Sequence, residues 1–134
     1  KPAWRGANLG GWLLLEPGPA SPFYEVCRER VATIKDAGLV AEKRSGEASW
    51  LDDESEHCLC KTLEQVGGPS LRKQMFAEHR AQHYTAGTFA QISRYGMNAV
   101  RIPFGHWVIT GPGDGESYEG PCLEVLDSAV SFAA

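Results

Sequence analysis

Two charged residues of this sequence lie at the ends of short apolar runs, where a side chain could take part in chemistry. Glu16 closes the apolar run over residues 9–16. Arg101 is the one charged residue in the run over residues 98–104, and Pro103 follows it closely. A guanidinium keeps its charge and binds a carboxylate through two hydrogen bonds, which lowers the pKa of that carboxylate. The pattern predicts two neighbouring strands that carry a carboxylate and a cation to one rim.

Structural alternatives exist for each of these residues. Arg101 could form an ion pair inside the fold, and Glu16 could cap a helix or a turn. His106 follows the second run, and its imidazole can hydrogen-bond a carboxylate or another polar group. Trp12 and Trp107 have aromatic faces that could stack on a ligand, but packing in the core or at the rim is the expected role of both.

The elements that must position these residues follow from the hydrophobic periodicity. A strand buried on both faces is predicted over 7–15, and several prolines then end it. Helical spacing covers 23–39, a helix capped by Asp52 or Asp53 runs to a break at 67–69, and another helix runs from 70 to about 83. A helix over 88–95 ends at Gly96 before a strand over 98–102. A glycine-rich loop over 110–120 leads to an amphipathic helix from residue 123 onward.

The order of strand, helical connection, strand and helix is the opening of an α/β fold with a parallel sheet. Two parallel strands are not stable alone, because they need helices on both faces and neighbours on both edges. Residues 1–134 are therefore interpreted as a single partial domain of about two strand–helix units, incomplete on its own. Such a chain is either a fragment or one part of a larger assembly.

The composition argues against several classes of function. The 134 residues are 43% hydrophobic and 22% charged, an ordinary globular balance. The net charge of -4 and the scattered basic residues make nucleic acid an unexpected partner. The longest apolar run, residues 12–15, is far shorter than the roughly 20 residues of a membrane helix. Since no charged leader opens the chain, we expect a soluble piece that has already been processed.

The cysteines and histidines leave disulfides open and give no metal motif. Four cysteines allow three pairings in a secreted protein, and buried thiols are the alternative. Cys58 and Cys60 would point apart on a helix, so any bridge would run to Cys27, to Cys122 or to another chain. The remaining histidines are expected at the surface or against helices: His57, His79 and His83. No metal ion or other cofactor is expected.

Several of these runs together resemble one family. Residues 6–17 closely resemble the start of the exo-β-1,3-glucanases (glucan 1,3-β-glucosidases) of glycoside hydrolase family 5. Residues 54–63 resemble the acidic segment of that family that leads to Leu-Cys-Lys, residues 98–107 its second strand, and residues 123–134 the following helix. The spacing of the helix before the second strand is matched by His79, Thr85, Phe89 and Ile92. The resemblance spans nearly the whole chain in the right order.

The resemblance implies the N-terminal portion of a TIM (β/α)8 barrel, about two of eight strand–helix units, since a complete barrel takes about 250 residues. It implies a secreted or cell-wall hydrolase that cleaves β-1,3-glucan with retention, through an acid/base glutamate and a nucleophile glutamate on later strands. Neither glutamate lies in this chain, so the isolated chain is expected to be inactive. By resemblance, Arg101 holds the nucleophile, Glu16 binds sugar hydroxyls in the terminal subsite, and His106 contacts substrate where the family usually has tyrosine.

Two further interpretations remain, and both change the expected partners. Besides β-glucan, the favoured interpretation needs the remainder of the barrel or other protein subunits as partners. The family often has an aromatic residue where this chain has Gly18, and this departure, like His106, favours a catalytically inactive carbohydrate-binding or assembly component. A third interpretation is a small interaction domain whose open strand edges are covered by an unrelated partner.

Overall fold

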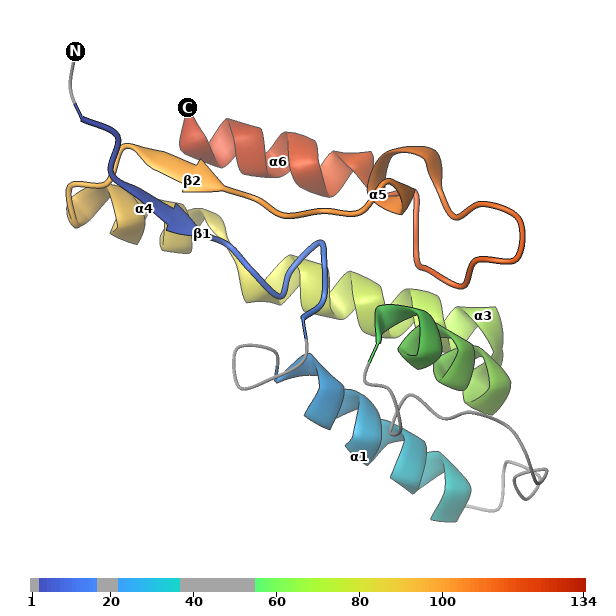
Figure 1. Cartoon of the computed structure of the whole chain (residues 1–134). Helices are drawn as coiled ribbons and strands as arrows, with labels where there is room; N and C mark the ends of the chain where they lie inside the picture. Colours follow the sequence, from blue (N-terminus) through green and yellow to red (C-terminus); the bar gives the residue numbers. More distant parts are fainter. Residues whose placement is uncertain (1–2, 17–21, 37–54) are drawn as a thin grey trace.

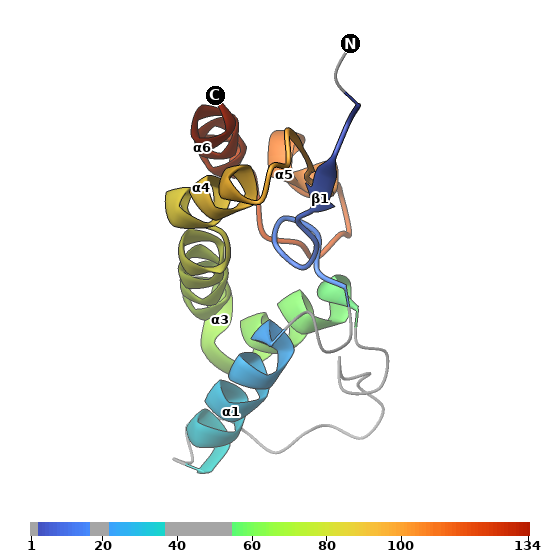
Figure 2. The ribbon, with the colours of Figure 1, turned by 90° about the vertical axis from the view of Figure 1, so that its left-hand side faces the viewer.

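The chain folds into a helix-rich domain that carries two short parallel strands. The computed structural model describes residues 3–16, 22–36 and 55–134. In chain order they form β1 (Gly6–Asn8), α1 (Phe23–Asp36), α3 (Glu56–His83), α4 (Ala86–Arg94), β2 (Ala99–Arg101), α5 (Trp107–Thr110) and α6 (Leu123–Ala133). Figure 1 shows α1 on one side of α3, and the strands with α6 on the other. In Figure 2, α6, α4 and α3 follow one another along one flank, opposite β1 and α5.

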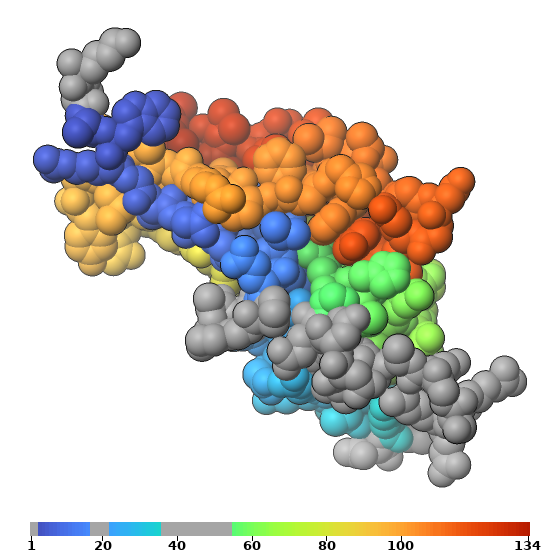
Figure 3. All heavy atoms as spheres, viewed as in Figure 1, coloured from blue at the N-terminus to red at the C-terminus, as the bar shows by residue number. Residues whose placement is uncertain are grey.

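The two strands pair in parallel, as predicted, but the first is shorter than the predicted strand over 7–15. The paired positions are Gly6 with Ala99, Ala7 with Val100 and Asn8 with Arg101. The first strand is interrupted because Gly11, in a turn, adopts a positive φ of 69°. Parallel pairing resumes at a bridge between Leu13 and Phe104. Both paired segments therefore run in the same direction toward Glu16 and His106, and their residues lie side by side on the face shown in Figure 3.

The long helix α3 begins at a cap and contains one break. The Ser55 side chain accepts a hydrogen bond from the Cys58 backbone N–H at 3.2 Å, which satisfies one donor of the first turn. The predicted caps at 52–53 lie outside the described residues. Gly68 has a non-helical backbone, with φ 72° and ψ -178°, which confirms the predicted interruption at 67–69. Helical turns resume at once and continue to His83, so both predicted helices are parts of α3.

Two clusters of buried apolar side chains hold these elements together. One cluster lies between α1 and α3, where the rings of Phe23 and Phe76 meet edge to face with centroids 5.1 Å apart. The other joins the strand segments to α4, α5 and α6 and includes Trp12, Val108 and Ala129. Each large apolar side chain buried in this way contributes on the order of 2 kcal/mol. The second cluster is the one that fixes the strands against their helices.

Two of the later helices lie where the sequence predicts them, and a third, short helix was not predicted. The helices predicted over 88–95 and from residue 123 correspond to α4 and α6. The short helix α5 was not predicted, because four residues are too few to show a helical period. In the part of the chain that the structure describes, no helix is long and apolar enough to cross a membrane.

The cysteines follow the thiol alternative. No disulfide joins the four cysteines, all of which lie among the described residues. Cys27, Cys60 and Cys122 are buried, the first between α1 and α3. Burial raises the pKa of Cys27 to about 12 and also raises the pKa of Cys60 and Cys122. These thiols therefore act as small core side chains.

Candidate functional site

Arg101 ends β2 directly opposite Asn8, the last residue of β1. The parallel register places the two residues abreast, and Arg101 Nη1 donates a hydrogen bond to Asn8 Oδ1 at 2.8 Å. Arg101 is exposed, and it forms no salt bridge with a carboxylate of the described residues. Its charge is thus held in place by a neutral amide and is available to an anion. Sequence reasoning placed Asn8 in the motif but gave it no role.

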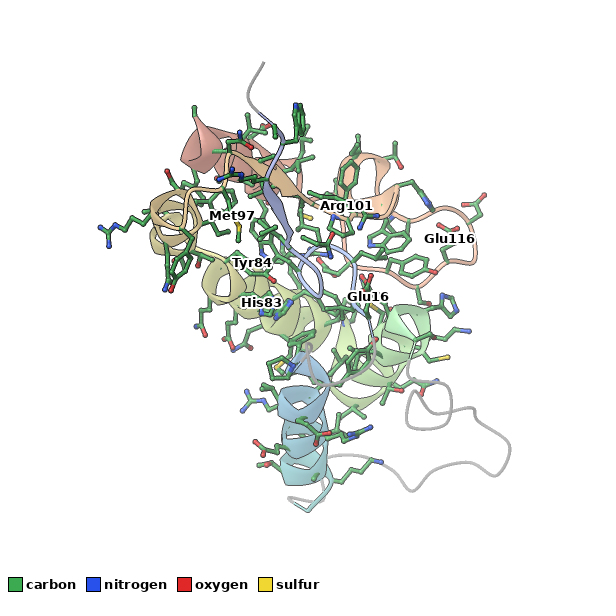
Figure 4. All side chains as sticks on the ribbon, turned by 60° about the vertical axis from the view of Figure 1, so that its left-hand side comes forward. Glu16, His83, Tyr84, Met97, Arg101 and Glu116 are labelled. Carbon is green, nitrogen blue, oxygen red and sulfur yellow. The ribbon has the colours of Figure 1, made fainter. Side chains whose placement is uncertain are left out.

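Glu16 lies near the same amide, beyond the turn at Gly10 and Gly11, here called the Gly10 turn. A Cβ built on Gly10 would lie 3.2 Å from Asn8 Nδ2 and 3.5 Å from Glu16 Oε2, so glycine leaves room for both polar groups. Glu16 is exposed, which leaves its carboxylate open to solvent. Figure 4 shows Glu16 and Arg101 on the same side of α3. The structure therefore brings Glu16 and Arg101 toward one region, with Asn8 between them.

The turn at Gly10 and Gly11, which carries this region, is attached through its backbone carbonyls to α3 and to Tyr84, the residue that follows α3. His79 Nε2 donates to Gly11 O at 2.8 Å, and the Tyr84 hydroxyl donates to Gly10 O at 3.1 Å. Burial, with a further contribution from the neighbouring His83, lowers the pKa of His79 to about 4. His79 is therefore neutral at pH 7, and because it donates through Nε2, its proton is on that nitrogen. A neutral donor in the core fixes the turn without burying a charge.

His106 follows the bridge at Phe104 and is paired with an acid that the sequence analysis missed. His106 Nε2 lies 2.9 Å from Glu116 Oε2, which also accepts the Gly113 backbone N–H at 2.7 Å. The backbone N–H of Gly113, and after it the contact with His106, lower the pKa of Glu116. Because Glu116 is ionised, the imidazole donates to it through Nε2. His106 is thus oriented at the strand end but has one nitrogen occupied.

A buried carboxylate lies behind both strand ends. Glu56, in the first turn of α3, is only 6% exposed. Its Oε2 accepts the Leu15 backbone N–H at 2.9 Å, and its Oε1 accepts Trp107 Nε1–H at 3.1 Å. Burial raises the pKa of Glu56, and the Leu15 N–H and the charge of Arg80 oppose that effect. Sequence analysis missed this residue, because nothing in its neighbourhood marks it as different from other helix-start acids.

The tryptophans pack as predicted. Trp12 is 2% exposed and Trp107 8% exposed. Trp12 Nε1 donates to the Arg80 backbone carbonyl at 2.9 Å, and the Trp107 ring stacks on Tyr118 with centroids 3.8 Å apart and planes 4° apart. Neither indole is available as an open platform for a sugar, so the polar residues carry the candidate site.

The chain matches curated proteins over almost all of its length. It is 33% identical over 96% of the chain to the probable glucan 1,3-beta-glucosidase A of Aspergillus clavatus, and 35% identical to that of Emericella nidulans. It is 31% identical, again over 96% of the chain, to the glucan 1,3-beta-glucosidase I/II of Saccharomyces cerevisiae. The chain is homologous to the glucan 1,3-β-glucosidases.

Homology to the glucan 1,3-β-glucosidases confirms the resemblance seen in the sequence. The chain spans about a quarter of the length of these relatives, 24% for the Aspergillus clavatus protein and 25% for the yeast protein, which is consistent with an N-terminal part. No protein-family model matches the chain.

Proposed function

We propose that this chain is the N-terminal part of a TIM-barrel hydrolase of glycoside hydrolase family 5 that cleaves β-1,3-glucan with retention. The observation that carries the proposal is the parallel pairing of β1 and β2, which gathers Glu16, Asn8 and Arg101 toward one region. Barrel enzymes build their sites at the C-terminal ends of their strands, where these residues lie. The names of the homologues supply the substrate class, β-1,3-glucan.

The proposed role of Arg101 is to hold the nucleophile carboxylate, which would come from a later strand outside this chain. Arg101 is exposed and bonded to the Asn8 amide, which orients the guanidinium without neutralising it. A bidentate contact with a carboxylate stabilises the ionised form and so lowers its pKa. A retaining glycosidase needs that carboxylate ionised at the start of each turnover.

Glu16 and His106 are the proposed substrate contacts at the two strand ends. The exposed carboxylate of Glu16 can accept hydrogen bonds from two sugar hydroxyls. His106, whose Nε2–H is held by Glu116, can accept a hydrogen bond from a sugar hydroxyl at Nδ1. This hydrolysis needs carboxylates and water only, so the proposal includes no cofactor. The proposal includes a location outside the cell or in the cell wall, as expected for an enzyme that acts on glucan there.

The test of the proposal is hydrolysis of laminarin by the full-length protein that contains this chain, measured as released reducing sugar. Arg101→Gln should lower kcat about 100-fold, because it removes the charge that stabilises the nucleophile. Arg94→Gln, at the exposed end of α4, is the matched control and should keep wild-type kcat. The isolated 134-residue chain should show no turnover.

Two outcomes would overturn the proposal. Binding of laminarin without hydrolysis by the full-length protein would favour a carbohydrate-binding component. Equal kcat for Arg101→Gln and the wild type would show that Arg101 does not support the nucleophile.

A further inference from the structure

One buried carboxylate contacts both segments that carry the proposed substrate contacts. Leu15, whose backbone N–H bonds Glu56 Oε2, directly precedes Glu16. Trp107, whose indole N–H bonds Glu56 Oε1, directly follows His106. Each carboxylate oxygen therefore accepts from a different strand end, at 2.9 and 3.1 Å. The side chain connects two segments that are far apart in sequence.

The surroundings of Glu56 make this connection rigid. The residue lies in the first turn of α3, so its backbone is fixed by the helix, and the helix N-terminus favours a carboxylate. The Trp107 ring is stacked on Tyr118 on one face. A Cβ built on Gly105 would lie 2.3 Å from the same ring, so the backbone passes very close to the indole. The indole N–H cannot turn away from Glu56 without moving these neighbours.

The energetic cost of this arrangement indicates a purpose beyond packing. A carboxylate that is 6% exposed loses most of its hydration, which is costly unless its hydrogen bonds compensate for the loss. An apolar side chain at this position would avoid that cost but would leave the Leu15 and Trp107 N–H groups without an acceptor and would not fix their positions. A planar acceptor with two oxygens, in contrast, sets the separation and orientation of the two donors.

We propose that Glu56 is a positioning residue that holds the strand ends bearing Glu16 and His106 in a fixed relation to each other. This inference rests on the proposed function for its effect on catalysis, since Glu16 and His106 are substrate contacts only there. Glu56 itself is buried and touches no substrate. Its action passes through the Leu15 backbone and the Trp107 ring.

The structural half of the inference is tested by hydrogen exchange in NMR, whether or not the protein is a hydrolase. Glu56→Gln keeps the shape but offers one oxygen, so one of the two donors must face an NH2 group. We expect the Leu15 amide or the Trp107 indole proton to exchange at least 10-fold faster than in the wild type. Glu78→Gln is the matched control, because Glu78 is an exposed α3 acid whose oxygen accepts from Gln74, a bond that glutamine can keep.

The functional half is tested by laminarin kinetics of the full-length protein. Glu56→Gln should raise KM and lower kcat, for a combined loss in kcat/KM of about 10- to 100-fold, and Glu56→Asp, which keeps both oxygens, should recover part of it. Val31→Ala, in the cluster between α1 and α3, is a stability control that should leave both constants unchanged. If Glu56→Gln does not fold, Trp107→Phe takes its place in the test. This variant keeps an aromatic ring but removes the donor to Glu56, and it should show the same kinetic defect.

The outcomes separate the two proposals. Unchanged exchange of both protons in Glu56→Gln overturns the inference. Faster exchange with wild-type kinetic constants also overturns it, because the strand ends then need no fixed relation. If the wild type hydrolyses no glucan, the proposed function fails, and the exchange result alone decides whether Glu56 joins the two strand ends.

Discussion

Acid should destabilise the fold through His79, and His79→Gln should remove that sensitivity. The imidazole lies between α1 and the Gly10 turn, where its ring stacks on Phe23 with centroids 4.3 Å apart and donates to Gly11 O. Protonation would place a second positive charge near Arg80 and beside the His83 ring, whose centroid is 4.7 Å away. Glutamine can keep the hydrogen bond to Gly11 without acquiring a charge.

The magnitude follows from the pKa of His79 in the two states. The pKa is 6.5 in a solvated chain and about 4 in the folded one, so the unfolded state binds the proton more readily between these values. Stability from this group is complete above pH 6.5 and is lost as the pH falls toward 4. At about 1.4 kcal/mol per pH unit, the loss reaches about 3 kcal/mol.

The assay is urea unfolding followed by tryptophan fluorescence at pH 7 and at pH 4. The wild type should lose about 3 kcal/mol more than His79→Gln over this range. The matched control is His57→Gln, which changes a histidine whose ring accepts the Ser117 backbone N–H. It should lose as much as the wild type, because His79 is retained. The same pH dependence in the wild type and in His79→Gln would refute the reasoning.

Two further predictions concern packing. Gly105→Ala should lower the free energy of unfolding by about 2 kcal/mol in urea titrations, because the new Cβ would overlap the Trp107 ring. Gly87→Ala in α4, where the nearest atom would be Thr85 Oγ1 at 3.5 Å, should instead raise it by about 1 kcal/mol; a loss there equal to that of Gly105→Ala would contradict the steric argument. Cys27 and Cys60, both 0% exposed, should react with a thiol reagent only at the rate of unfolding, and rapid labelling in the absence of urea would show that they are not in a core.

The sequence predicted what depends on local pattern. Gly96 and the apolar run after it predicted β2, and residues 67–69 predicted the break in α3, because glycine and proline act through their own backbone. The strand over 7–15 was predicted too long. Its apolar run does not show that His79 of α3 and Tyr84, just after α3, donate hydrogen bonds to the carbonyls of Gly11 and Gly10 and so hold a turn there.

The candidate site was only partly predictable for a different reason. Arg101, Glu16 and His106 were found because of their places relative to strand ends. Glu56 was missed because its partners are distant in sequence: it bonds Leu15 across 41 residues and Trp107 across 51. Glu116 was missed because it lies in a loop, where no periodic pattern links it to His106. No spacing rule connects such positions, so only a fold can reveal that these acids lie beside the strand ends.

The strands themselves indicate what the chain needs. The described sheet has two strands, so each strand has one edge without a strand neighbour among the described residues. Phe104, at the bridge that extends the pairing, is 40% exposed, and Trp4, just before β1, is 88% exposed. Parallel sheets normally bury both faces and pair both edges. The relatives are about four times as long as the chain, so further strands from such a protein could cover these edges and bring carboxylates to Arg101. The region of Glu16, Asn8 and Arg101 is thus held in place by side chains of α3, while Glu16 and Arg101 remain exposed. The proposed function requires this arrangement.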